Sequence, residues 1–210
     1  WHRRPEPAGG LLTHVQSDQF KLHAEVEEIH WWFLARRRIL RELAYSLAPP
    51  SKHTLAIDVG CGTGGNIAAF AHDYTCIGID TSAEGIRFSK SRFPEVRFIC
   101  GSAPADLGDA AKQAGLFLLT DVLEHIEDDV AFLSELLTAL RPGACILLTV
   151  PADMSLWSEH DVAYGHYRRY DIQNLERVWS GLPVTVRLLS YFNARLYPMV
   201  RTIRALNRLR

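Results

Sequence analysis

Apolar and polar positions follow two alternating patterns along most of the chain. Short apolar runs predict strands at 55–59, 75–79, 96–100, 116–120 and 144–150, and a sixth at 184–189. Segments with helical spacing lie between them, at 66–70, 83–92, 128–140 and 171–180. Strands that alternate with helices are typical of a parallel sheet with helices on both faces. We therefore predict a doubly wound α/β fold for residues 51–193.

The segments that flank this core have other patterns. Residues 1–16 are expected to be flexible, and residues 17–50 are rich in helix formers and are expected to form a helical lid. Residues 194–210 combine apolar positions at helical spacing with five arginines and no acid, which predicts a basic amphipathic helix. Such a helix can pack on its own domain or on a second subunit. The alternative, which we favour less, is a peripheral contact with an anionic membrane.

Composition excludes several classes of protein. A chain of 210 residues is expected to form one domain, with or without a small appendage, and its net charge of −1 is not the bulk positive charge of a nucleic-acid-binding protein. No apolar run has the length of a membrane span, and no signal peptide is recognisable. The four cysteines show no metal-binding spacing, so we interpret them as reduced thiols and expect a cytoplasmic location.

A glycine-rich turn follows the first strand, in Leu55-Ala-Ile-Asp-Val-Gly-Cys-Gly-Thr-Gly-Gly-Asn66. Gly60, Gly62 and Gly64 let the backbone approach a ligand closely, and the amides at the start of the next helix point at the turn. This is a nucleotide-binding pattern. The spacing also satisfies G-x-G-x-x-G, so a dinucleotide cofactor and an NAD(P)-dependent oxidoreductase remain an alternative.

Asp58 favours a different ligand from a dinucleotide. It lies two residues before the first glycine, at the end of the strand. A carboxylate there suits a ligand with an ammonium group and would repel a pyrophosphate at close range. Asp80, at the end of the second strand, would bind ribose hydroxyls in either case.

Four motifs carry a resemblance to a known family: Asp58-Val-Gly-Cys-Gly-Thr-Gly64, Asp80, Asp121-Val-Leu-Glu-His125 and Leu140-Arg-Pro-Gly143. From about residue 30 to 193 the chain resembles class I S-adenosylmethionine-dependent methyltransferases. The segments Trp31-Trp-Phe33 and Gly165-His-Tyr-Arg-Arg-Tyr170 are similar to those of a bacterial small-molecule group (type 11/23-like). The resemblance implies a Rossmann-like sheet. The family's seventh, antiparallel strand is not evident, and we expect either a truncated chain or a differently finished sheet edge.

The resemblance also implies S-adenosylmethionine as cofactor and assigns residues to it. The residues expected to face its methionine part are Asp58, Gly60, Cys61, Gly62 and Gly64. Arg36 or Arg37 of the lid would reach the carboxylate, and of the two we prefer Arg37. Asp80 would take the ribose hydroxyls, and Thr81, Ser102 and Ala103 would line the adenine. Asp121 and Val122 would close the site beneath the sulfonium. At position 102 the family commonly has an acid, where this chain has Ser102.

Methyl transfer needs a base only if the acceptor must lose a proton. His125, His160 and His166 are the candidates, because histidine titrates near neutral pH and all three follow strands at the ligand-binding edge. Structural roles in the loops are the alternative for each. His160, Asp161 and His166 are too loosely spaced to predict a metal site, and we predict none.

The sequence therefore predicts methyl transfer from S-adenosylmethionine to an oxygen or nitrogen of a small-molecule acceptor. Arg168 and Arg169 are compatible with an anionic, sugar-type or lipid-linked acceptor, or with a solvated pair beside the helix cap Asp171. The alternatives are the NAD(P)-dependent oxidoreductase and a catalytically silent, methyltransferase-like binding module.

Overall fold

The computed structural model describes residues 24–192 and 194–207. The chain divides into two compact units. The first comprises Trp1–Leu118 and Leu140–Leu147, and the second comprises Leu119–Ala139 and Leu148–Arg210. The segment 1–16, predicted to be flexible, and the first part of the predicted lid lie outside the described residues.

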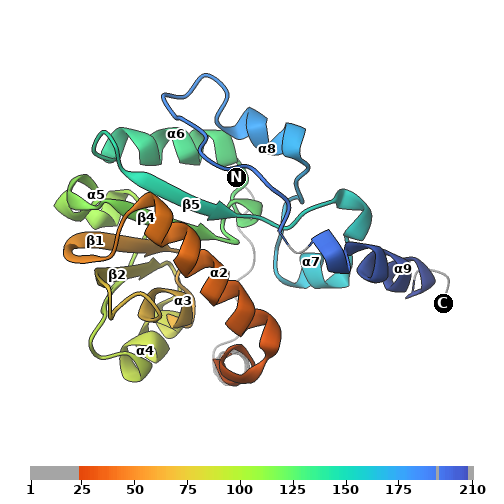
Figure 1. Cartoon of the computed structure of the whole chain (residues 1–210), viewed down its shortest axis with the longest axis horizontal. Helices are drawn as coiled ribbons and strands as arrows, with labels where there is room; N and C mark the ends of the chain where they lie inside the picture. The colour runs from red at the N-terminus through yellow and green to blue at the C-terminus, as the bar shows by residue number, and fades with distance from the viewer. Residues whose placement is uncertain (1–23, 193, 208–210) are drawn as a thin grey trace, which may run out of the picture. The chain divides into compact units, whose positions relative to one another are not determined.

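The first unit is built on a five-stranded sheet with the order β3-β2-β1-β4-β5 (Figure 1). The strands are β1 (Ser51–Val59), β2 (Tyr74–Asp80), β3 (Arg97–Cys100), β4 (Leu116–Thr120) and β5 (Cys145–Thr149). β1 pairs in parallel with both β2 and β4, and β2 pairs in parallel with β3. The chain order reverses between β1 and β4, the point where open α/β sheets bind ligands. The predicted doubly wound fold is confirmed. The last two residues of β4 and of β5 belong to the second unit.

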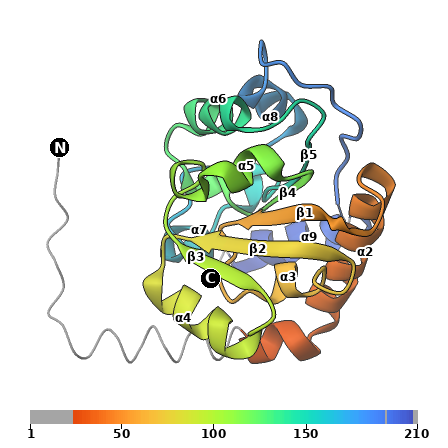
Figure 2. The same cartoon turned by 90° about the vertical axis from the view of Figure 1, so that its left-hand side faces the viewer.

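Helices α2 (Trp31–Leu47), α3 (Gly65–Ala68), α4 (Ala83–Arg92) and α5 (Asp109–Gln113) flank this sheet, as Figure 2 shows. Residues 24–29, just before α2, are also helical. α4 begins where predicted, because the Ser82 hydroxyl accepts a hydrogen bond from the Gly85 amide at 3.1 Å. A short 3-10 helix, η1 (Ala105–Leu107), follows β3.

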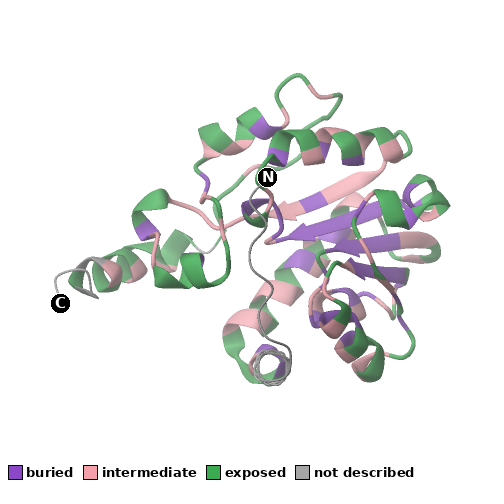
Figure 3. Ribbon diagram, turned by 180° about the vertical axis from the view of Figure 1, so that it is seen from behind, coloured by how far each residue is buried: buried purple, intermediate pink, exposed green. Residues whose placement is uncertain are grey.

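The core of the first unit lies between the sheet and its helices. Ala56 and Ile57 of β1 and Leu116 and Phe117 of β4 are fully buried. Figure 3 shows how the buried residues gather on the central strands. Ala44 of α2 is also fully buried and lies in one core cluster with Ala56 and Leu116, so α2 is an integral part of the unit.

The second unit is mainly helical. It contains η2 (Leu123–His125), α6 (Asp129–Ala139), η3 (Met154–Leu156), α7 (Glu159–Ala163), α8 (Ile172–Val178), η4 (Ala194–Leu196) and α9 (Tyr197–Asn207). A buried hydrogen bond joins two of its segments, since the Tyr170 hydroxyl donates to a carboxylate oxygen of Asp129 at 2.6 Å.

The sixth strand predicted at 184–189 is wrong. This segment has no regular secondary structure, and Val184, Val186 and Leu188 are 36%, 49% and 61% exposed. Its apolar residues alternate as in a strand, but neither face of the segment is buried. Alternation without a surface to cover does not make a strand.

The predicted C-terminal helix is present as α9 over Tyr197–Asn207. The Tyr197 hydroxyl donates a hydrogen bond to Asp153 at 2.5 Å, whereas Met199 and Ile203 are 55% and 50% exposed. Among the described residues, no helix combines the length and the apolar character that a membrane span requires.

Candidate cofactor site and histidine cluster

The glycine turn after β1 has the left-handed backbone that its sequence requires. Gly60, Gly62 and Gly64 have φ values of 70°, 51° and 80°. The amide of Gly60 donates to the carbonyl of Ile79 at 2.8 Å, which fixes the turn to β2. A Cβ added to Gly62 would meet no atom within 4 Å, whereas one added to Gly64 would lie 2.9 Å from the Phe98 ring. Gly62 therefore faces open space, and Gly64 faces packed protein.

Asp80 holds the same turn from the end of β2. One of its carboxylate oxygens accepts a hydrogen bond from the Gly62 amide, and the other accepts one from the Ser82 amide, both at 2.8 Å. Each carboxylate oxygen has a further lone pair, so ribose hydroxyls could still bind there. The ribose role assigned to Asp80 stays a prediction.

Asp58 is the least satisfied group in this part of the molecule. Its side chain is fully buried, and among the described residues neither carboxylate oxygen has a hydrogen-bond partner. Burial, and then the charge of Asp80, raise the pKa of Asp58 to about 8, while Arg36 acts in the opposite direction. A buried polar group without a partner is costly. An ammonium group bound at the turn could satisfy this carboxylate, so the residues present fit the predicted cofactor.

The helical residues 24–29 cover the glycine turn. The Glu27 carboxylate accepts a hydrogen bond from the Thr63 hydroxyl at 2.9 Å and pairs with the Arg92 guanidinium at 2.7 Å. A Cβ added to Gly65 would lie 2.5 Å from the Glu27 carboxylate. Sequence reasoning missed Glu27 and Arg92, because no local motif links residues so distant in the chain.

The lid arginines differ in what they contact. The guanidinium of Arg37 donates to the backbone carbonyl of Glu27. Arg36 lies close enough to Asp58 to lower the pKa of its carboxyl group. From the sequence either arginine could bind the methionine carboxylate, with Arg37 preferred, and that assignment stays a prediction.

The residues expected beside the adenine lie after β2 and β3. Thr81 and Ser102 are exposed, and Ala103 is buried. The Ser102 amide donates to the Asp106 carboxylate at 2.7 Å, so an acid is present close to position 102. Cys61, within the glycine turn, is buried, and burial raises the pKa of its thiol further above its ordinary value.

In the second unit, Asp121 has an unusual backbone. Its φ is 59°, in the left-handed region that few residues other than glycine adopt. Its amide donates to the Thr149 carbonyl at 2.9 Å, and the Thr149 hydroxyl donates to its carboxylate at 3.1 Å. The neighbouring Val122 is buried. Strained residues of this kind concentrate at functional sites.

The three predicted catalytic histidines form one cluster in the second unit. The ring centroids of His125 and His166 are 4.7 Å apart, and those of His160 and Tyr164 are 4.3 Å apart. Tyr164 also lies 6.4 Å from His166, so it links the two pairs. Desolvation lowers the pKa of His160, which favours its neutral form.

Arg168 and Arg169 are held by acids of the second unit. The Arg168 guanidinium pairs with Asp129 at 2.7 Å, and the Arg169 guanidinium pairs with Asp161 at 2.8 Å. The side chains of Arg168 and Arg169 are 29% and 11% exposed. The two arginines are therefore not a solvated pair, and each positive charge is already paired with a carboxylate.

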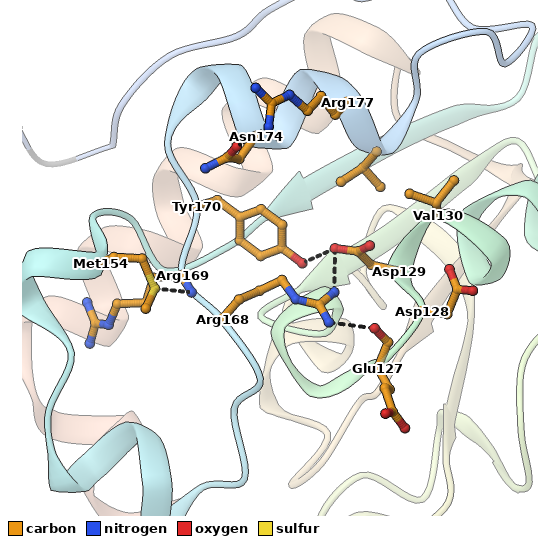
Figure 4. A pocket seen from close by; sticks show the side chains of 11 residues that line it. Glu127, Asp128, Asp129, Val130, Met154, Arg168, Arg169, Tyr170, Asn174 and Arg177 are labelled. Carbon is orange, nitrogen blue, oxygen red and sulfur yellow. Dashed lines mark hydrogen bonds and ion pairs between the residues drawn. The ribbon is translucent and has the colours of Figure 1, made fainter.

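A cavity of about 730 Å³ lies beside this arginine pair (Figure 4). Its walls include Glu127, Asp129, Arg168, Tyr170 and Asn174. No residue that we assigned to the cofactor or to catalysis lines it. Because its central charges bind one another, we do not interpret this cavity as the active site.

Comparison with known proteins identifies the class. The chain superposes on the YcgJ protein of Bacillus subtilis with a TM-score of 0.63 at 17% identity, covering 79% of this chain and 76% of that one. It superposes on the N-methyltransferase NodS of Bradyrhizobium japonicum, solved with S-adenosyl-L-homocysteine, with a TM-score of 0.56 at 15% identity, covering 72% and 75%. Together with the glycine turn, these likenesses define a class I S-adenosylmethionine-dependent methyltransferase fold.

The sequence comparisons point to the same class. Residues 57–148 match the family described as a methyltransferase domain, so this segment is a methyltransferase domain of the class that uses S-adenosylmethionine as its cofactor. The chain is 30% identical to the trans-aconitate 2-methyltransferase of Azoarcus sp. over 55% of its own length. It spans about half the length of the curated relatives it matches, 46% in this case. The oxidoreductase alternative is therefore abandoned.

Proposed function

We propose that this protein transfers the methyl group of S-adenosylmethionine to an oxygen or nitrogen atom of a small-molecule acceptor. The observation that carries the proposal is Asp58, a fully buried carboxylate without a hydrogen-bond partner among the described residues, at the start of the glycine turn. When bound, S-adenosylmethionine supplies a methyl group activated by its sulfonium. Its ammonium group supplies a positively charged partner for the Asp58 carboxylate.

Each binding residue has a role that follows from its surroundings. Asp58 would pair with the ammonium group, and Gly62 leaves open space for the ligand beside the turn. Asp80 would bind the ribose while it holds the turn through the Gly62 and Ser82 amides. For the carboxylate of the ligand we propose Arg36 or Arg37. Alanine substitution of each, with S-adenosylhomocysteine affinity as the measurement, separates the two.

The chemistry needs alignment more than it needs reactive groups. The acceptor atom forms a bond to the methyl carbon as the carbon–sulfur bond breaks, and alignment alone can supply roughly 7–11 kcal/mol in favourable cases. If the acceptor must lose a proton, a neutral histidine can take it. His160 fits this role, because desolvation lowers its pKa and favours its neutral form.

The acceptor proposal combines the relatives with the charges of the site. The Azoarcus relative is named for trans-aconitate and the NodS protein for N-methylation, so a carboxylic acid and a nitrogen acceptor are both compatible with the proposal. Arg168 and Arg169 are held by Asp129 and Asp161, which weakens the case for an acceptor gripped by these arginines. A cytoplasmic location remains part of the proposal, on the basis of the four free thiols.

A panel assay tests the proposal. The protein is incubated with S-adenosylmethionine and with carboxylic acids that include trans-aconitate, with sugar acids, and with primary and secondary amines. Formation of S-adenosylhomocysteine is followed by mass spectrometry, together with a methylated product of the acceptor. We expect one class of acceptor to give turnover that depends on enzyme concentration.

The Asp58→Asn variant is the control, because an amide keeps the shape of the side chain but cannot neutralise an ammonium group. It should lose both binding and turnover. Binding of S-adenosylmethionine without turnover on any acceptor would support the silent binding module. Equal binding by wild type and Asp58→Asn would contradict the role of Asp58.

A further inference from the structure

Three potential metal ligands converge in the second unit. Glu124, His125 and His166 each offer a ligand atom, and these atoms all lie within 4.8 Å of one another. Two segments far apart in sequence meet there, since the Tyr167 amide donates to the Glu124 carbonyl at 2.7 Å. Sequence reasoning considered His160, Asp161 and His166 and predicted no metal site. The structure brings together a different set.

The types of ligand restrict the ion. Two imidazole nitrogens and one carboxylate oxygen are a set found around zinc and other divalent transition metals. Mg²⁺ and Ca²⁺ prefer oxygen ligands only. Three protein ligands leave at least one coordination position open for water or for another molecule. Glu124 is buried and His125 is exposed, so an ion can reach the set from solvent through His125.

A second carboxylate orients one of the ligands. Nδ1 of His166 lies 3.0 Å from a carboxylate oxygen of Asp161, which leaves Nε2 as the nitrogen for an ion. Asp161 is fully buried and accepts further hydrogen bonds from the Ser158 amide at 2.9 Å and from the Arg169 guanidinium at 2.8 Å. Metal-binding histidines characteristically donate their other N–H to such a carboxylate.

The hydrogen bonds of Asp161 suit this role. Its carboxylate accepts from the Ser158 amide and the Arg169 guanidinium, and it lies where it can accept the N–H of Nδ1 on His166 and leave the lone pair of Nε2 for an ion.

We propose that Glu124, His125 and His166 form a binding site for one divalent transition-metal ion of the zinc type, with Asp161 as a positioning residue. The inference rests on these contacts and not on the proposed methyl transfer, so it stands or falls separately from it. The alternative is a metal-free cluster of hydrogen-bonded side chains.

The test uses the whole chain after treatment with EDTA and dialysis. Titration with ZnCl₂ by calorimetry should show one ion bound per chain, and MgCl₂ in excess should not displace it. Co²⁺ should bind at the same site and give visible absorption bands of a nitrogen-ligated, low-coordinate ion. This spectrum reads the site in the wild-type protein without any substitution.

Variants locate the ion. His125→Ala and His166→Ala should abolish stoichiometric Zn²⁺ binding, and Asp161→Asn should weaken it about 10- to 100-fold, as loss of a second carboxylate does in other sites. His160→Ala is the matched control, because His160 lies in the same cluster but is not one of the three ligands; its affinity should equal that of the wild type. Circular dichroism checks that each variant is folded. If His166→Ala is unfolded, His166→Gln is used in its place.

Three results would overturn the proposal. The first is no Zn²⁺ binding and no Co²⁺ spectrum in the wild type, which would leave the metal-free cluster. The second is Zn²⁺ binding that His125→Ala and His166→Gln do not change, which would place the ion elsewhere. The third is displacement by Mg²⁺, which would exclude the zinc-type class.

Discussion

The carboxylate of Glu27 lies 2.7 Å from the guanidinium of Arg92, although 65 residues separate them in sequence. The side chains are 9% and 13% exposed, and the same guanidinium donates to the carbonyl of Thr63 at 3.1 Å. The pair therefore ties the segment before α2 to the end of α4 and to the glycine turn between β1 and α3. We regard it as the main contact that fixes residues 24–29 over the turn.

Breaking this pair should destabilise the first unit. Glu27→Gln leaves the Arg92 charge without its inner partner, and loss of one member of a buried pair costs roughly 3–5 kcal/mol. Urea denaturation measures the change in the free energy of unfolding. Glu28→Gln is the matched control: Glu28 bonds the same guanidinium at 2.5 Å but its side chain is 59% exposed, so we expect a loss below about 1 kcal/mol. Equal losses in the two variants would show that burial of Glu27 does not matter.

Two glycines of the turn should respond differently to alanine. Both have positive φ, so each substitution costs roughly 1–2 kcal/mol in backbone strain. Gly64→Ala should cost about 1–3 kcal/mol more, because its Cβ meets Phe98 at 2.9 Å and Ser89 at 3.0 Å. Gly62→Ala meets nothing in the protein and should instead weaken S-adenosylhomocysteine binding.

Thermal melting and calorimetry separate these two effects. The expected order is a lower melting temperature for Gly64→Ala than for Gly62→Ala. If Gly62→Ala binds S-adenosylhomocysteine as tightly as the wild type, the open space beside the turn is not where the ligand lies.

Cofactor binding should release a proton from Asp58. With a pKa of about 8, this group is mostly protonated in the free protein at neutral pH. An ammonium group favours the ionised form, so binding at about pH 6 should release about one proton from it, and affinity should rise as pH rises toward about 8. Calorimetry in buffers of different ionisation enthalpy counts the proton. A count that does not change in Asp58→Asn would assign the proton to another group.

The same carboxyl group should make stability depend on pH. Its pKa is raised from 3.8 in the unfolded chain to about 8 in the folded protein. The folded state therefore binds the proton more tightly, and this contribution is complete below pH 3.8 and is lost as pH rises through about 8. Between pH 3.8 and about pH 8, the titration of Asp58 should lower the free energy of unfolding by at most about 1.4 kcal/mol per pH unit.

Asp58→Asn removes that contribution and leaves the other titrating groups in place. Urea denaturation at several pH values without ligand measures the free energy of unfolding of both proteins. As pH rises, the value for the wild type should fall relative to that of the variant. A difference that is flat with pH would mean that the Asp58 carboxyl group is not strongly perturbed in the folded protein.

The sequence predicted the parts of the molecule that depend on local order. The five strands of the sheet, the glycine turn and the helix cap at Ser82 follow from apolar runs and from residue types that act on their immediate neighbours. The methyltransferase class followed from motifs of the same local kind. The strand predicted at 184–189 is wrong. Alternation of apolar and polar residues describes the chain itself and does not show whether another part of the protein covers the apolar side.

Contacts between distant segments were beyond such reasoning. From the sequence, Thr63 is one more small residue of the turn. In the structure its hydroxyl donates a hydrogen bond to Glu27, 36 residues earlier. From the sequence, Arg169 is a candidate for binding an anion, but in the structure its guanidinium pairs with Asp161. Likewise, His125 and His166 form one cluster only because two loops meet through the amide of Tyr167.

The short approach of Gly65 to Glu27 also bears on how this chain can vary. A Cβ at position 65 would lie 2.5 Å from the Glu27 carboxylate, so an alanine there collides as long as residue 27 is glutamate. A smaller residue at 27 removes the collision but also removes the buried carboxylate that pairs with Arg92. Positions 27, 65 and 92 thus form an epistatic set: the tolerance of each to substitution depends on the other two.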